Sequence, residues 1–153
     1  VLSVAADPLD PLGEAAETLH ALAPRYPTWT ADYYHQVAAR VDQIAVMTYG
    51  SAFPTPALYG SFVRMETAAL LRSVDPGVRL FVGIPTYDVV GWGFLHHAET
   101  LSAAVRGIRE GVVGFSTRRV DDLSGAIYAD WTTTGADWRA YERAWLRPGA
   151  ASL

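Results

Sequence analysis

Polar and aromatic residues follow the apolar runs of this 153-residue chain, where barrel enzymes place their catalytic groups. The clearest run is 44–47 (IAVM), and Thr48, Tyr49 and Gly50 come directly after it. A continuous apolar run that ends in turn residues predicts a strand buried on both faces, as in a parallel sheet. Tyr49 is therefore the first candidate for a catalytic group. Its phenol could bind a substrate, or it could pack under a loop with its hydroxyl satisfied.

Three aspartates, Asp7, Asp88 and Asp130, each follow a predicted strand, so a parallel sheet would gather them at one edge. Carboxylates gathered there could act as acid and base, or hold sugar hydroxyls. We assign Asp7 to a turn because Pro8 follows it, and we favour a binding role for Asp88 and Asp130. None of the three has the sequence signature of a catalytic acid.

Aromatic residues share the same loops, namely Tyr87, Trp92 and Trp131. Aromatic rings stack on the C–H faces of sugars, so tryptophans on these loops would suit a carbohydrate cleft. The alternative is that they cover the rim of a barrel or pack against another part of the protein. Trp131 is the preferred platform, and Trp92 fits both interpretations equally. A stripe at helical spacing is assigned to the core: Trp138, Tyr141 and Trp145.

The strands that would position these residues are predicted at 1–6, 43–48, 79–84 and 125–129. Helices are predicted at 13–23, at 30–40, from Ser61 onward, at 98–110 and along the closing aromatic stripe. Strands that recur about every 35 to 45 residues, with helices between them, favour a parallel sheet. Four strands cannot close a barrel, for which eight is the usual number. We therefore predict one α/β domain over 1–153: half of a (βα)8 TIM barrel, with four parallel strands and outer helices.

The composition narrows the classes of partner and cofactor. The net charge is −4, and no basic cluster occurs, so neither a nucleic-acid nor a membrane partner is expected. Cysteine is absent, which excludes a disulfide and a zinc site built on sulfur. The adjacent His96 and His97 do not share a helix face, so we predict a solvated helix start and no metal or other cofactor. Arg118-Arg119 with Asp121-Asp122 is interpreted as a solvated charged turn.

Three of the predicted strands resemble those of family 18 glycoside hydrolases, the chitinase-like (βα)8 enzymes. Residues 42–49 (DQIAVMTY) resemble the sixth strand of that family, and 80–87 (LFVGIPTY) are similar to the seventh. Residues 125–128 (GAIY) look like the eighth, and 1–6 would be the fifth. The resemblance covers nearly the whole chain in the correct order.

The resemblance implies that Tyr49 contacts the acetamido group of a sugar, whose oxygen is the nucleophile in this family. It places Tyr128 where the family usually has a tryptophan. Two features depart from the pattern: the Asp-rich motif that ends in the acid Glu is absent and would lie upstream of Val1, and Gly50 replaces the acid that follows the tyrosine. Secretion would suit the family, although the chain does not begin with an intact signal peptide.

The sequence thus predicts a glycoside hydrolase-like half barrel that contributes sugar-binding loops to a carbohydrate-processing site. One alternative is a chitinase-like barrel that binds carbohydrate without cleaving it. Another is a half barrel that pairs with itself. Because unpaired strand edges recruit partners, we expect either an N-terminal half barrel or a second copy of the chain beside this one.

Overall fold

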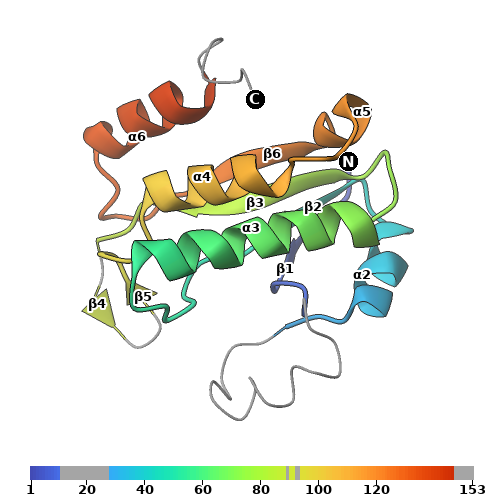
Figure 1. The fold of residues 1–153 in the computed structure, drawn as a ribbon, viewed down its shortest axis with the longest axis horizontal. Coiled ribbons are helices and arrows are strands. Elements are labelled where there is room, and N and C mark those ends of the chain that lie inside the picture. The colour runs from blue at the N-terminus through green and yellow to red at the C-terminus, as the bar shows by residue number, and fades with distance from the viewer. Residues whose placement is uncertain (11–27, 89, 92–93, 147–153) are drawn as a thin grey trace.

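The computed structural model describes residues 1–10, 28–88, 90–91 and 94–146, and it alternates strands with helices (Figure 1). The sheet contains four strands: β1 (Ser3–Ala6), β2 (Gln43–Val46), β3 (Arg79–Pro85) and β6 (Leu123–Tyr128). They lie in the order β1-β2-β3-β6, and every neighbouring pair is parallel. The predicted fold class is confirmed: an α/β half barrel in which strands adjacent in sequence are also adjacent in the sheet.

The helices lie outside this sheet. They are α2 (Ala31–Ala38), α3 (Pro56–Ser73), α4 (Leu101–Gly111), α5 (Thr117–Val120) and α6 (Gly135–Tyr141), which continues into the π-helical turn η2 (Glu142–Leu146). Helices α3 and α4 run side by side over one face of the sheet (Figure 1). Threonine caps several of them: Thr30, Thr55 and Thr100 each accept a backbone N–H from the first turn.

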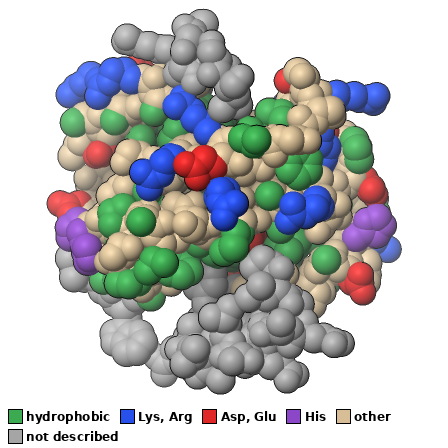
Figure 2. Space-filling view, in the orientation of Figure 1, with side chains coloured by type: hydrophobic (Ala, Val, Ile, Leu, Met, Phe, Trp, Pro, Cys, Tyr) green, Lys and Arg blue, Asp and Glu red, His purple; other side chains and the backbone are tan. Residues whose placement is uncertain are grey.

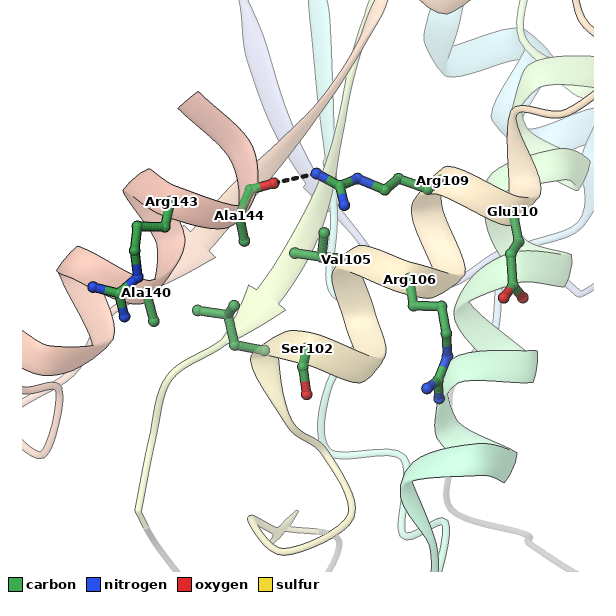
Figure 3. A pocket seen from close by; sticks show the side chains of 9 residues that line it. Ser102, Val105, Arg106, Arg109, Glu110, Ala140, Arg143 and Ala144 are labelled. Carbon is green, nitrogen blue, oxygen red and sulfur yellow. Dashed lines mark hydrogen bonds between the residues drawn. The ribbon is translucent and has the colours of Figure 1, made fainter. Parts of the chain in front are cut away.

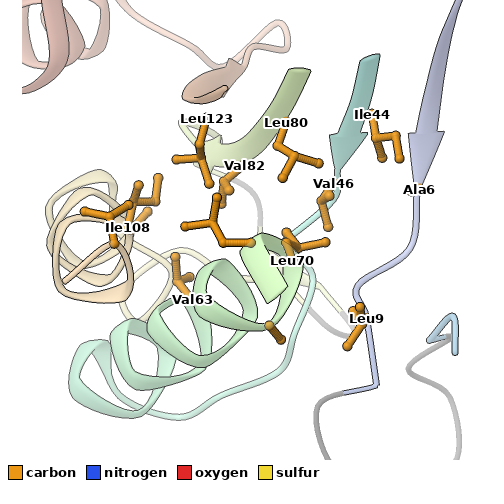
Figure 4. Close-up of a cluster of buried hydrophobic side chains, with 14 of the residues drawn as sticks. Ala6, Leu9, Ile44, Val46, Val63, Leu70, Leu80, Val82, Ile108 and Leu123 are labelled. Atoms are coloured by element: carbon orange, nitrogen blue, oxygen red, sulfur yellow. The ribbon is translucent and has the colours of Figure 1, made fainter. Parts of the chain in front are cut away.

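The hydrophobic core fills the space between the sheet and these helices (Figure 4). Its buried side chains come from the strands (Ile44, Val46, Leu80, Val82 and Leu123) and from the helices (Val63, Leu70 and Ile108). Alternate strand residues point to opposite faces, so Ala45, Met47 and Phe81 face away from the helices. No described helix covers that second face. A doubly wound fold would have helices on both faces, whereas a barrel has them only on the outside.

Two local elements differ from the sequence prediction. Helix α3 begins at Pro56 and not near Ser61, because Thr55 caps it by accepting Leu58 N at 3.3 Å and proline suits the first helical turn. A short antiparallel hairpin, β4 (Val90–Gly91) and β5 (Phe94–Leu95), interrupts the loop after β3. The helix predicted at 13–23 lies outside the described residues.

The prediction for the charged turn was wrong at Arg119, which is buried. Its guanidinium donates to Leu71 O at 3.1 Å, to Val74 O at 2.5 Å and to the Asp122 carboxylate at 3.1 Å. These carbonyls are the ones left without partners where α3 ends, so Arg119 acts as its C-terminal cap.

The prediction that the closing stripe belongs to the core holds for two of its three members. Tyr141 and Trp145 pack against the core as expected. Trp138 does not, because 45% of it is exposed.

The helix-covered face shows arginine and acidic side chains interspersed with hydrophobic ones, without one continuous basic patch (Figure 2). No helix in the described part of the chain is long and apolar enough to cross a membrane.

Candidate functional site

Three tyrosines meet at the carboxyl ends of the strands. Tyr49 follows β2, Tyr87 follows β3 and Tyr128 ends β6, and parallel strands bring these positions to one edge of the sheet. The rings of Tyr49 and Tyr128 are stacked, with centroids 4.3 Å apart and planes 26° apart. Tyr87 stands edge-on to both, at 6.3 Å from Tyr49 and 6.0 Å from Tyr128. The structure therefore brings together three of the residues singled out from the sequence.

The ring of Tyr49 lies on the backbone of β3 at Gly83. A Cβ added to Gly83 would come within 2.7 Å of the Tyr49 Cε1 atom and 2.9 Å of Val46 O, so only glycine allows this approach. Burial, and to a lesser extent the neighbouring Tyr128, raises the pKa of Tyr49 to about 12. The phenol therefore keeps its proton throughout the physiological range. Among the described residues the Tyr49 hydroxyl has no hydrogen-bond partner, so its proton remains available to a ligand.

Tyr87 is held differently, by the buried Glu99. The Tyr87 hydroxyl donates to Glu99 and accepts Gly50 N at 3.2 Å. Glu99, which is only 2% exposed, also accepts Gly50 N at 3.1 Å, and Ser51 N and Ser51 Oγ at 2.5 Å each. Both carboxylate oxygens thus have two donors. Glu99 ties the loop after β2 to the start of α4, and it positions Tyr87 instead of offering a free acid.

Asp130 shapes the loop that presents Trp131. Its Oδ1 accepts both the N–H and the hydroxyl of Thr132 at 2.7 Å, a local turn that occupies this oxygen. Trp131, at the tip of this loop, is 90% exposed. A tryptophan this exposed gains almost nothing from packing inside its own chain, which leaves its faces free.

Asp88 and His96 stand at the two ends of the loop that contains the β4–β5 hairpin. Asp88 Oδ1 and His96 Nε2 are 3.5 Å apart, and the Asp88 side chain is 77% exposed. Both residues line a cleft of about 340 Å³ between the loops after β3 and β6, together with Thr132 and Thr134. His96 is predicted to lie in a solvated loop, and 37% of its side chain is exposed, while its Nδ1 is buried without a hydrogen-bond partner in the described regions.

Two sequence candidates remain, Asp7 and Trp92. Asp7 lies in the turn after β1, as predicted, and its carbonyl accepts the Tyr34 hydroxyl. Trp92 lies outside the described residues. Within the described ranges no group of three or more His, Asp or Glu side chains is arranged to hold a metal ion.

A larger cavity, of about 470 Å³, lies away from the strand ends, in the outer layer of helices (Figure 3). All its lining residues belong to α4, α6 and η2, and they include Arg106, Arg109 and Arg143. Arg109 donates to Ala144 O at 2.5 Å, across the space between α4 and η2. We interpret this cavity as the packing gap beside the last helix.

A second buried carboxyl group, Glu66 on α3, holds the loop after β1. Its Oε1 accepts Leu9 N at 2.5 Å, while its Oε2 has no partner within the described segments. Burial raises the pKa of Glu66 to about 8; the Leu9 hydrogen bond opposes the shift and Asp10 adds to it. Neither Glu66 nor Glu99 could be identified from the sequence. Their only signal is a glutamate in or beside an amphipathic helix, which is usually an exposed residue.

Comparison of the chain with protein-family models, with curated proteins and with solved structures yields no match.

Proposed function

We propose that this half barrel binds carbohydrate at the carboxyl ends of its strands and contributes that surface to a glycoside hydrolase-like site. The observation that carries the proposal is the stacked pair of Tyr49 and Tyr128 at the strand ends, together with the exposed Trp131 on the loop that follows Tyr128. This end of the sheet offers stacked rings, one nearly fully exposed tryptophan and one phenol whose proton is not used by any described residue. Sugars present apolar C–H faces and polar hydroxyl or acetamido groups, and these residues offer a complement to each.

Within the proposal, Tyr49 donates a hydrogen bond to the ligand. Its raised pKa, about 12, keeps the proton on the phenol, so it acts as a donor and not as a base. Trp131 supplies the stacking face. The carboxylate of the exposed Asp88 accepts hydrogen bonds from sugar hydroxyl groups at the rim of the adjacent cleft.

The described carboxylates favour binding over cleavage by this chain alone. Glu99 is saturated by four donors, and Asp130 is engaged by Thr132. Asp88 is open to solvent. A general acid needs a carboxyl group that is kept protonated by an apolar site, as in other glycosidases, and no strand-end carboxylate described here has such surroundings. The proposed cleavage therefore requires an acid from another half barrel, and a barrel that only binds carbohydrate is the second candidate.

Isothermal titration of the purified chain with soluble chitooligosaccharides tests the binding step. We expect measurable binding, which weakens about fivefold in Trp131→Ala, because the loss of one stacking contact is worth about 1 kcal/mol. Tyr49→Phe should weaken binding by a similar factor, because it removes only the donated proton. Trp138→Ala is the matched control, since it deletes an exposed tryptophan of α6 that lies outside the cluster.

Absence of binding by the wild-type chain would contradict the proposal, as would equal losses in the Trp131 and Trp138 variants. Mass spectrometry of the incubated sugars separates the two candidate functions. Shortened products would show that this chain cleaves unaided, whereas intact sugars together with binding would favour the binding function.

A further inference from the structure

The cleft of about 340 Å³ between the loops after β3 and β6 is lined by hydroxyl and carboxyl groups. Each lining hydroxyl group already has a hydrogen-bond partner inside the chain: Thr86 with Tyr128 O, Tyr87 with Glu99, Thr100 with Ser102, Thr132 with Asp130, and Thr134 with Asp137. Glu99 is occupied as well, because each of its two oxygens accepts two hydrogen bonds. These groups are therefore engaged before a ligand arrives.

Two carboxylate oxygens of the same cleft have no partner in another described residue. Asp137 Oδ2 accepts the Thr134 N–H at 2.8 Å and the Thr134 hydroxyl at 2.6 Å, which leaves its Oδ1 unused. Asp88 Oδ1 lies 3.5 Å from His96 Nε2, and its Oδ2 is not used by the described part of the chain. Because an ionised carboxyl group accepts hydrogen bonds and donates none, what the cleft offers to a ligand is acceptors.

The charge of the cleft favours the same kind of ligand. Its lining includes three carboxyl groups, those of Asp88, Glu99 and Asp137, and one imidazole, that of His96. No arginine lines it within the described ranges, whereas the cavity in the helix layer has three. Hydrogen bonds from the Thr134 hydroxyl and N–H lower the pKa of Asp137, so this carboxylate is ionised at neutral pH. The cleft is therefore negative and attracts a cation that brings its own N–H donors.

The cleft adjoins the surface that we propose to bind sugar. Tyr87 lines the cleft, and its ring stands edge-on to Tyr49 at 6.3 Å and to Tyr128 at 6.0 Å. Thr132, another lining residue, directly follows the exposed Trp131 in the sequence. A sugar oligomer that contacts these aromatic rings can therefore place a neighbouring unit in the cleft. The substituent on that unit then faces the two unused carboxylate oxygens.

We propose that this cleft binds a sugar unit with a free, protonated amino group, so that the ligand of the site is a partly deacetylated amino-sugar oligomer. An ammonium group brings three N–H donors and a positive charge. An acetamido group brings one N–H donor, and its carbonyl oxygen needs a donor that the engaged hydroxyl groups do not supply. The adjacent unit keeps its acetamido group, whose oxygen accepts the Tyr49 proton. The inference rests on the proposed function and names the substrate class of the same site.

Isothermal titration of the chain compares chitotetraose with a partly deacetylated tetramer, in slightly acidic buffer of low ionic strength. The partly deacetylated tetramer should bind about fivefold more tightly, an effect of the size expected for charge pairs in a solvent-exposed cleft. High salt should reduce this ratio of affinities. Asp88→Asn and Asp137→Asn should each lower the ratio to about twofold. Asp121→Asn is the matched control and should keep the ratio, since it removes the same charge from an exposed residue before β6, at the opposite end of the strands.

Equal affinities for the two tetramers would overturn this inference and leave the proposed function intact. No binding of either tetramer would contradict the proposed function itself, on which the inference rests. A preference that survives in both Asp88→Asn and Asp137→Asn, or that falls equally in Asp121→Asn, would show that the cleft does not bind the amino group. Cadaverine, a diamine without a sugar, should bind more weakly than the partly deacetylated tetramer. If it binds as tightly, the cleft is a general cation site and the assignment to an amino sugar is wrong.

Discussion

Two buried glutamates hold two neighbouring loops at the carboxyl ends of the strands, and they differ in the number of hydrogen bonds that they receive. Glu99 receives four hydrogen bonds from Gly50, Ser51 and Tyr87 and locks the loop after β2. Glu66 is equally buried, but it receives one, from Leu9, and its second oxygen has no partner in the described part of the chain. The difference shows that burial alone does not decide what a carboxyl group contributes. The number of donors around it decides whether it stabilises the fold or strains it.

The same substitution at both positions tests this contrast, and the larger effect is expected at Glu99. Each carboxylate oxygen of Glu99 accepts two hydrogen bonds, and Glu99→Gln replaces one of these oxygens by an NH₂ group, which cannot accept them. Leaving two buried donors unsatisfied should lower the free energy of unfolding by about 3 kcal/mol, measured by urea denaturation. Glu110→Gln, on the exposed side of α4, is the matched control and should change stability by less than about 0.5 kcal/mol. A loss at Glu99 no greater than the control would remove the contrast.

Glu66→Gln should act in the opposite direction. Since the folded-state pKa of Glu66 is raised from 4.5 to about 8, the folded chain keeps a proton that the unfolded chain loses in this interval. Stability should therefore fall as pH rises from about 4.5 to about 8. Glu66→Gln removes this dependence, so the variant should be more stable than the wild type at pH 8, by about 1–2 kcal/mol. The gain is limited to this size because the buried amide still has one polar atom without a described partner.

Urea denaturation of both proteins, at about pH 5 and about pH 8, measures the effect at Glu66. Parallel pH profiles for the two proteins would show that Glu66 does not titrate differently in the folded state.

The tyrosines give the smallest of the three effects and sharpen the comparison. Tyr87→Phe deletes one of the four donors to Glu99 and should cost about 1 kcal/mol in thermal or urea unfolding. Tyr49→Phe deletes a hydroxyl with no described partner and should leave stability within about 0.5 kcal/mol. Equal losses at both positions would mean that the two hydroxyls are not engaged differently, and that the Tyr49 proton is not free for a ligand.

The strands and their order could be predicted from sequence because the information is local. The run at 44–47 and the turn residues after it are sufficient to identify β2, and the same holds for β3. The start of α3 was missed because prolines around Thr55 were interpreted as loop residues, although one of them suits the first helical turn. The β4–β5 hairpin has only two residues in each strand, too few for any periodic signal.

From the sequence, only those residues of the candidate site that lie at the ends of strands could be predicted. Tyr49 and Tyr87 follow strands and Tyr128 ends one, and parallel geometry alone brings them together. Glu99 was missed because its partners Gly50 and Ser51 lie 48 or more residues away in sequence. Arg119 was wrongly predicted to be solvated for the same reason: the two carbonyl groups that accept hydrogen bonds from its guanidinium lie 45 and 48 residues earlier in the sequence. Contacts at such separations leave no mark in composition or spacing.

The Arg119 cap has a consequence for how this chain could change without unfolding. Arg119 and Asp122 join the end of α3 to the start of β6, and Asp122 also accepts Gly77 N at 3.0 Å from the turn before β3. All these contacts lie at the amino ends of the strands, opposite the aromatic cluster. Loops at the aromatic end can therefore be exchanged or lengthened while the hydrogen bonds of Arg119 and Asp122 keep the opposite end in place. New ligand preferences can thus arise without a change in the rest of the fold.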